Sequence, residues 1–268
     1  LYTEELTAHA QQRVEIAFEL RRALDQQELR VYYQPVHDLK TSRLVGVEAL
    51  VRWEHPERGL VSPAEFIPIA ERTGMIAEID AWVMQQACRQ MCQWQADGVV
   101  LSFIAVNVST RLFARSELYQ QVAQVLHETG LDPAYLELEV TESAVMDDPE
   151  VALEQMHRLR ELGIRLAIDD FGTGYSSLLR LKRLPVQKLK IDQGFVAGLP
   201  FDEDDAAISR VIIALAQSMG MQVHAEGIEQ VEQARFLLEH ACDLGQGYWF
   251  GRPMPAAQLV WSNAPQIR

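Results

Sequence analysis

Short extended runs alternate with longer helical runs along almost the whole chain. Apolar residues cluster or recur at every second position in eight runs, which predict strands at residues 30–36, 44–53, 101–108, 135–141, 164–169, 186–192, 221–226 and 244–249. Between them, apolar residues recur every three to four positions, which predicts helices at 63–72, 76–97, 116–129, 149–162, 203–219 and 230–240. This repetition, without a Pro/Gly/Ser-rich linker, favours one barrel over two domains.

The first two predicted strands differ from the rest. Only residues 37–43 separate them, whereas a parallel crossover needs about a dozen residues, so we expect an antiparallel hairpin. The predicted fold is therefore α/β, a single (β/α)8 TIM-type barrel with an antiparallel first strand. A weak helical period near the N-terminus predicts a helix that leads in from an upstream domain. We divide the chain into a linker helix (1–28), a barrel (29–260) and a C-terminal tail (261–268).

Composition and charge limit the classes of ligand and the cellular locations that fit this chain. The 268 residues are 48% apolar and 23% charged, as in ordinary globular proteins. A formal charge of −14 repels DNA, RNA and anionic membranes, so a phosphate-bearing ligand would need metal ions as counter-charge. No apolar run reaches the ~18 residues of a membrane span. Three cysteines are too few for a disulfide scaffold, so we expect a cytoplasmic domain, with membrane attachment of a longer protein left open.

Acidic and amide side chains stand at the carboxyl ends of the predicted strands, where barrels of this kind hold their reactive groups. Within 135–141, Leu138 and its apolar neighbours share one face, whereas Glu139 lies on the other. Because apolar faces pack against helices, Glu139 and Asp169 should point into the barrel mouth. The full set is Glu48, Asn107, Glu139, Glu142, Asp169, Asp170, Lys190, Asp192, Glu226 and Gln246.

So many acids at one mouth need a counter-charge, because bare carboxylates repel each other by several kcal/mol in a site of reduced dielectric. Oxygen ligands suit Mg²⁺ or Mn²⁺ better than zinc. The adjacent Asp169 and Asp170 can engage two ions, an arrangement that favours phosphodiester hydrolysis. Any one acid could instead be a solvated loop carboxylate, but the pattern recurs at five strands or more.

Two further features belong to this mouth. Lys190 has the inward parity, and a lysine can orient or deprotonate a water molecule. The segment 170–177 contains two glycines and several hydroxyl residues, which suits either a simple turn or a mobile loop that completes the site.

A deeper layer is also polar. The same parity points Glu137, Lys188 and His224 inward, with Arg165 one layer further down. An isolated buried charge costs several kcal/mol, so we predict that Glu137 pairs with Lys188, Arg165 or His224. The alternative is that the strands are offset and one of these groups reaches solvent.

The ordered motifs are similar to those of the EAL family of cyclic di-GMP phosphodiesterases. The match runs from about Leu29 to Pro255. It comprises Glu48-Ala49-Leu50, Asn107-Val108-Ser109, Glu139-Val140-Thr141-Glu142, Asp169-Asp170-Phe171-Gly172-Thr173-Gly174, Lys190-Ile191-Asp192, Glu226-Gly227 and Gln246-Gly247-Tyr248. The resemblance implies a barrel with an antiparallel first strand and hydrolysis of one phosphodiester bond of cyclic di-GMP to linear pGpG, with two Mg²⁺ or Mn²⁺ ions.

The resemblance also implies residue roles. One ion would be bound by Glu48, Asn107, Glu139 and Asp169, and the other by Asp169, Asp170 and, through water, Glu226. The catalytic residues would be Lys190, which handles the nucleophilic water, with Glu226 and Glu48. Glu142 would anchor the loop at 170–177. Arg52 would contact a substrate phosphate, although alone it would suit a surface salt bridge. The substrate-binding set would be Gln34, Leu50, Arg52, Asp192 and Gln246.

Three functions follow in order of preference. The first is the phosphodiesterase, since no catalytic position departs from the family pattern. The second is a catalytically silent cyclic di-GMP sensor, and the third is a protein-interaction module that binds no nucleotide. Turnover with Mg²⁺ separates the first two. We further expect inhibition by Ca²⁺ and an upstream regulatory or GGDEF domain in a longer protein. A homodimer is an open alternative to a monomer, and DNA and RNA polymers are not expected partners.

Overall fold

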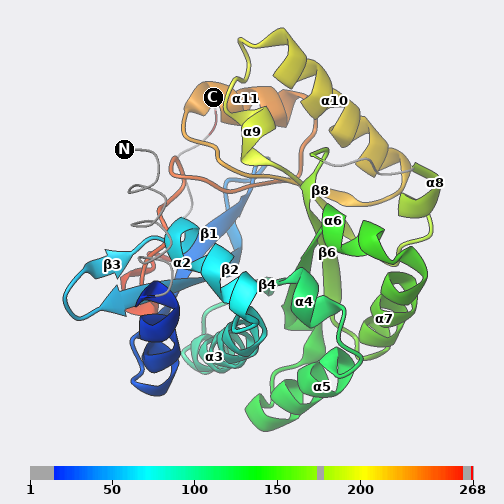
Figure 1. The fold of residues 1–268 in the computed structure, drawn as a ribbon. Coiled ribbons are helices and arrows are strands. Elements are labelled where there is room, and N and C mark those ends of the chain that lie inside the picture. The colour runs from blue at the N-terminus through cyan, green and yellow to red at the C-terminus, as the bar shows by residue number, and fades with distance from the viewer. Residues whose placement is uncertain (1–14, 174–177, 262–266, 268) are drawn as a thin grey trace, which may run out of the picture.

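Eight strands close into a barrel, and helices surround it (Figure 1). The computed structural model describes residues 15–173, 178–261 and 267. The barrel strands are β1 (Leu29–Asp38), β2 (Leu44–His55), β4 (Phe103–Val108), β5 (Leu136–Thr141), β6 (Arg165–Phe171), β7 (Lys188–Ile191), β8 (Gln222–Ala225) and β9 (Leu244–Gly245). A further short strand, β3 (Gly59–Val61), extends β2 as a hairpin outside the barrel.

The first strand is antiparallel to both of its neighbours, as predicted. β1 pairs with β2 from Leu29↔Trp53 onward and with β9 at two positions, whereas the other barrel pairs are parallel. A tight turn makes this hairpin possible. The Asp38 carboxylate accepts a hydrogen bond from the Thr41 N–H at 2.6 Å, and Ser42 takes a left-handed conformation.

The longer helices cover the outside of the barrel (Figure 1). They are α2 (Pro63–Thr73), α3 (Ile76–Ala96), α5 (Leu118–Thr129), α7 (Pro149–Glu161), α10 (Glu203–Ser218) and α11 (Val231–Glu239). Gly74 and Gly130 end α2 and α5 in the left-handed conformation that glycine adopts without strain. Two 3-10 turns, η1 (Pro133–Tyr135) and η2 (Ala256–Gln258), complete the elements with α8 (Leu178–Leu181) and the three short helices below.

Short helices begin immediately after three of the strands. They are α4 (Thr110–Phe113), α6 (Glu142–Asp147) and α9 (Gln193–Val196). The side chains of Ser109, Thr141 and Asp192 cap them by accepting hydrogen bonds from backbone N–H groups. Because each chain segment turns into a helix at once, the strand-end side chains stay at the barrel mouth.

The predicted elements differ from the structure mainly at their ends. The strand expected at 244–249 stops at Gly245, because the chain leaves the sheet there and Gln246 already lies at the mouth. Residues 15–25 are helical, and Ile16 and Leu20 are buried against the barrel core. The remainder of the expected lead-in helix, residues 174–177 of the loop and most of the C-terminal tail lie outside the described residues. None of the helices described here is long and apolar enough to cross a membrane.

Apolar residues fill the space between strands and helices, and the inside of the barrel is layered. A small apolar cluster of Val36, Phe103, Ala105 and Leu244 lies deep inside. Charged side chains, including Lys188, Lys190, Glu137 and Glu139, occupy the layers above it and are almost completely buried. The barrel interior therefore concentrates charge where solvent is excluded.

Candidate active site

A cavity of about 370 Å³ opens at the carboxyl ends of the barrel strands. Eight side chains expected at the site line it, namely Gln34, Glu48, Leu50, Arg52, Asn107, Asp169, Glu226 and Gln246. The fold thus brings together residues that are as far as 212 positions apart in the sequence. Lys190 and Glu139 lie beneath this lining and are fully buried.

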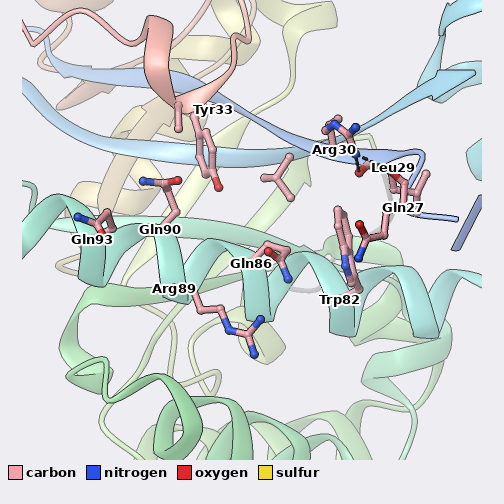
Figure 2. Close-up of a pocket in the computed structure, with 11 residues that line it drawn as sticks. Gln27, Leu29, Arg30, Tyr33, Trp82, Gln86, Arg89, Gln90 and Gln93 are labelled. Atoms are coloured by element: carbon pink, nitrogen blue, oxygen red, sulfur yellow. Dashed lines mark hydrogen bonds between the residues drawn. The ribbon is translucent and has the colours of Figure 1, made fainter. Parts of the chain in front are cut away.

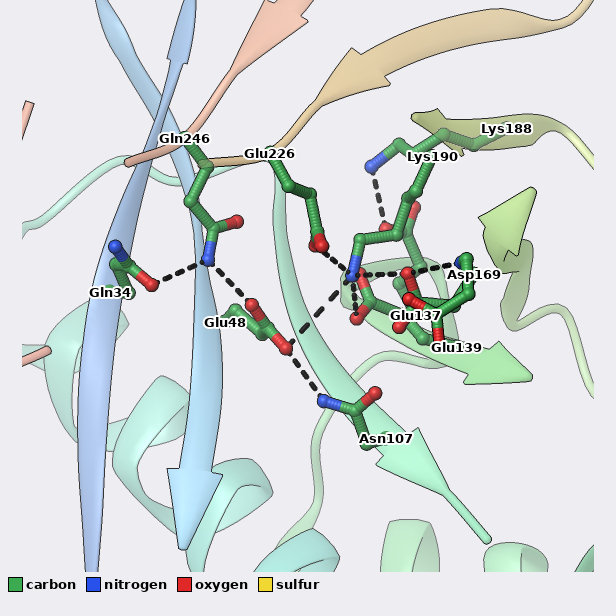
Figure 3. A network of polar contacts seen from close by, with 11 residues as sticks. Gln34, Glu48, Asn107, Glu137, Glu139, Asp169, Lys188, Lys190, Glu226 and Gln246 are labelled. Carbon is green, nitrogen blue, oxygen red and sulfur yellow. Dashed lines mark hydrogen bonds and ion pairs between the residues drawn. The ribbon is translucent and has the colours of Figure 1, made fainter. Parts of the chain in front are cut away.

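Lys190 lies at the centre of the site (Figure 3). Its Nζ is 2.5 Å from Glu139 Oε2, 2.5 Å from Glu226 Oε1 and 3.2 Å from Asp169 Oδ1. Glu48 Oε1 is 4.0 Å away. Burial alone would lower the pKa of Lys190, but these carboxylates outweigh it and raise the pKa well above 10.5. Lys190 is therefore a fixed cation among the acids.

One ammonium does not neutralise this cluster. Glu48, Glu139, Asp169, Asp170 and Glu226 carry five formal negative charges, an excess of four over Lys190. Burial raises the pKa of Glu139 well above its usual value, with Glu48 and Asp169 adding to the rise against Lys190. Burial likewise raises the pKa of Glu226 to about 8, although Lys190 opposes the rise. Lys190 alone therefore does not supply enough positive charge to keep all five acids ionised.

Both aspartates of the pair reach the mouth because strand β6 is irregular there. The pairing of β6 with β7 shifts register between Ile168 and Phe171, and Asp170 has a φ of 53°. A regular strand would point the two side chains to opposite faces, whereas a bulge re-aims one of them. Burial and then Asp169 raise the pKa of Asp170 to about 6. Asp169, Asp170 and Glu226 each offer an oxygen within 4.8 Å of the others.

A chain of amide contacts orients Glu48. Asn107 Nδ2 donates to Glu48 Oε1 at 2.6 Å, and Gln246 Nε2 donates to Glu48 Oε2 at 2.5 Å. Gln246 Nε2 also donates to Gln34 Oε1 at 2.9 Å, so the amides link β1, β2 and the segment after β9 (Figure 3). Burial would raise the pKa of Glu48, but Lys190 and the two amide donors hold it below its usual value. Asn107 keeps its amide oxygen to offer to a metal.

The donor set fits hard divalent cations. The ligand atoms are carboxylate and amide oxygens, which Mg²⁺ and Mn²⁺ prefer. Within the described part of the chain, Glu139 Oε1 is buried without a hydrogen-bond partner, and three carboxylates converge at one point. Cations bound there would supply the positive charge that Lys190 alone does not provide.

Other predicted residues have defined contacts. Glu142 Oε2 accepts a hydrogen bond from the Gly172 N–H at 2.9 Å, which ties α6 to the start of the segment after β6. Arg52 is half-buried on the cavity wall, and its Nη1 donates to the Val51 carbonyl at 2.7 Å. Asp192 caps α9 by accepting from the Gly194 N–H at 2.9 Å.

Sequence reasoning missed several residues of the cavity wall. Gln193, Glu229, Tyr248 and Pro253 line it but were not expected as site residues. Gln193 and Glu229 follow motif residues by one to three positions, and Tyr248 ends the motif that begins at Gln246, so this adjacency was the available signal. Tyr248 also packs under Arg252, whose guanidinium carbon is 4.0 Å from the ring centroid.

A second cavity, of about 670 Å³, lies outside the barrel between β1 and α3 (Figure 2). Figure 2 shows Trp82, Gln86, Gln90 and Gln93 along α3, facing β1 with Tyr33. No carboxylate lines this cavity among the described residues, so it cannot hold the cations that the mouth can. The smaller cavity at the mouth is therefore the candidate active site.

Known proteins resemble this chain over nearly its full length. A sequence profile described as EAL domain matches residues 17–253. The "Bifunctional diguanylate cyclase/cyclic di-GMP phosphodiesterase MucR" of Pseudomonas aeruginosa is 45% identical over 263 residues, which are 98% of this chain and 38% of that protein. The "Cyclic di-GMP phosphodiesterase NbdA" of the same organism is 43% identical over 258 residues, 96% of this chain and 33% of that protein. This chain therefore spans less than two fifths of either relative.

Solved structures share the fold. The structure titled "PaMucR Phosphodiesterase, c-di-GMP complex" has a TM-score of 0.89 and 46% identity, covering 92% of this chain and 100% of that one. The EAL enzyme Bd1971, in a form bound to cAMP and cyclic di-GMP, has a TM-score of 0.88 and 32% identity, covering 96% of this chain and 70% of that one.

Proposed function

The chain belongs to the EAL domain family, and from this premise we propose that it hydrolyses one phosphodiester bond of cyclic di-GMP to give linear pGpG with the help of two Mg²⁺ or Mn²⁺ ions. The observation that carries the proposal is the cluster of five carboxylates around Lys190 at the barrel mouth, which has an excess of four formal negative charges when every acid is ionised. Two divalent ions would balance that excess.

The proposed ligands divide into two sets that share one residue. Glu48, Asn107, Glu139 and Asp169 would hold one ion. Asp169 and Asp170 would hold the other, with Glu226 contributing through water. When bound, such ions make water more acidic and stabilise negative charge on phosphate oxygens.

The protein's own residues position the reactants. Lys190, held as a cation by the neighbouring carboxylates, would donate a hydrogen bond to the attacking water. This contact would keep a lone pair of the water oxygen directed at phosphorus. Arg52, on the cavity wall, would bind a substrate phosphate with a guanidinium that stays charged. Glu142 would hold the loop at 170–177 through Gly172. Leu50 and Asp192 would complete substrate binding, with Gln34 and Gln246 beside them.

We expect Ca²⁺ to inhibit. It accepts oxygen ligands but prefers more of them at longer distances, so it should occupy the site without supporting attack by water. Binding of Ca²⁺ by calorimetry together with absence of product supports this, and undiminished hydrolysis with Ca²⁺ as the only divalent ion would contradict it.

Product analysis tests the proposal. The purified chain is incubated with cyclic di-GMP and Mn²⁺, and the products are separated by liquid chromatography with mass detection. We expect pGpG from the native chain and none from Glu48→Ala. Binding of cyclic di-GMP without product would support the silent sensor instead, and no binding at all would favour an interaction module.

The wider context stays a prediction. The relatives are longer than this chain, which supports an upstream regulatory or GGDEF domain joined through the linker helix at 1–28. A homodimer could use apolar side chains that α8 and α10 expose, such as Leu179 and Val211, and light scattering would measure it. The boundaries 29–260 and 261–268 and the cytoplasmic location are likewise predictions.

A further inference from the structure

A second ion pair lies below the one at the mouth and joins the same two strands (Figure 3). Lys188 Nζ is 2.6 Å from Glu137 Oε1, and both side chains are at most 2% exposed. Two residues further along each strand, Lys190 contacts Glu139. The prediction that Glu137 pairs with a cation is thus confirmed, with Lys188 as the partner. Because β6 lies between β5 and β7, both pairs span the barrel interior in front of β6.

Small residues make room for this pair. The inward residue of β6 at this level is Ala167, whose Cα pairs with Glu139 on one side and with Lys188 on the other. A methyl group leaves space for the two long side chains to meet in front of it. Below them, the Phe103 ring centroid is 3.7 Å from Lys188 Nζ. The ring itself fits because the facing residue is Gly46, where a Cβ would lie 2.5 Å from it.

The imidazole predicted in this layer is uncharged. His224 is completely buried, and burial followed by Lys188 and Lys190 lowers its pKa well below 6.5. Glu137 and Lys188 are therefore in direct contact beside an uncharged imidazole. Buried pairs of this kind contribute little net stability compared with apolar residues, so their placement needs another reason.

We propose that Glu137 and Lys188 form a positioning pair that fixes the spacing of β5 and β7 and so holds Glu139 and Lys190 in place. The upper pair cannot do this alone, because Glu139 would have to share its carboxylate between Lys190 and a bound cation. Within the described part of the chain, the lower pair has no hydrogen bond or ion pair to a proposed ligand, so it stays closed in both states. Its effect on turnover rests on the proposed function, whereas its effect on cation affinity does not.

Two variants separate positioning from stability. Lys188→Met leaves Glu137 buried without its partner and should lower the melting temperature. The double variant Glu137→Leu/Lys188→Met replaces the pair by apolar side chains and should restore the melting temperature. If the pair positions the site, the double variant still binds Mn²⁺ about 10-fold more weakly and has a kcat about 10-fold lower, with KM within about threefold. A double variant whose melting temperature, Mn²⁺ affinity and kcat all match those of the native chain would overturn the proposal.

Ala167→Val provides an independent test because it keeps both charges but fills the gap between them. It should weaken Mn²⁺ binding by about 10-fold as well. If the double variant fails to fold, this variant decides, and an unchanged Mn²⁺ affinity would then overturn the proposal. Leu159→Ala in the outer core serves as the control: it should lower the melting temperature and leave Mn²⁺ affinity within about twofold.

The two proposals fail differently. Mn²⁺ affinity is measured by electron paramagnetic resonance of the free ion, without nucleotide. If the native chain binds Mn²⁺ but produces no pGpG, the proposed function fails and the affinities of the variants still decide on the positioning pair. If the native chain binds no Mn²⁺, both are overturned.

Discussion

Replacing Lys190 by methionine should destabilise the metal-free protein and make it more dependent on cations. The substitution keeps the length and apolar stem of the side chain but removes the ammonium. Glu139, Glu226 and Asp169 then lose a contact of 2.5 to 3.2 Å each, and Glu48 loses its nearest cation. What remains is a buried group of carboxylates without counter-charge.

The size of the effect follows from this geometry. Removing one partner of a buried ion pair costs about 3–5 kcal/mol. Lys190 serves several carboxylates, so we expect a loss near the upper end, reduced where an acid takes up a proton. For a domain of this size such a loss lowers the melting temperature by on the order of 10 °C. Added Mn²⁺ should restore more stability in the variant than in the native chain, because no ammonium competes for the ligands.

Thermal unfolding in EDTA and over a series of Mn²⁺ concentrations measures both effects. Lys182→Met is the matched control, since Lys182 is exposed and should respond like the native chain. The variant should produce no pGpG even where Mn²⁺ restores its stability. A melting temperature in EDTA equal to that of the native chain, or a smaller Mn²⁺ response, would refute the electrostatic reasoning.

Three further predictions concern single contacts. Glu48→Ala should lower kcat by at least about 100-fold in a product assay with Mn²⁺, because it removes a proposed metal ligand and leaves the amides of Asn107 and Gln246 without their shared acceptor. Glu142→Ala releases the Gly172 N–H and should lower kcat about 10-fold while the Kd for cyclic di-GMP stays within threefold. Burial raises the pKa of Asp80 to about 6, despite the Ser109 N–H that it accepts at 2.9 Å. The neutral form is therefore favoured in the fold, and its stabilisation is full below pH 4 and is lost as pH rises through 6. Asp80→Asn should gain about 2–3 kcal/mol over the native chain between pH 4 and 7 in urea unfolding, and a difference that does not change with pH would contradict this.

Most of the barrel could be predicted because period and connection length are local properties of the sequence. The seven residues between the first two strands were enough to exclude a parallel crossover and so to orient β1. Strand ends were harder. The run 244–249 continues to the aromatic residues Tyr248 and Trp249, yet the sheet ends at Gly245, because pairing depends on neighbouring strands that a single run does not reveal.

The site could be predicted where strand parity applied and less well elsewhere. Parity placed Glu139 and Lys190 in the interior and Glu137 next to a cation. It could not show that Asp169 and Asp170 point the same way, since adjacent strand residues normally alternate and only the bulge in β6 allows it. Gln193, at the start of α9, and Glu229, in the segment after β8, lie on the cavity wall beyond the strands, where no strand period guides a prediction.

The most direct test of the acidic mouth is anomalous diffraction from crystals of the chain grown with Mn²⁺ and cyclic di-GMP. We predict two manganese peaks, one among Glu48, Asn107, Glu139 and Asp169 and one beside Asp170, with Lys190 withdrawn from Glu139. A nucleotide bound in the cavity with no manganese between it and these side chains would contradict the account.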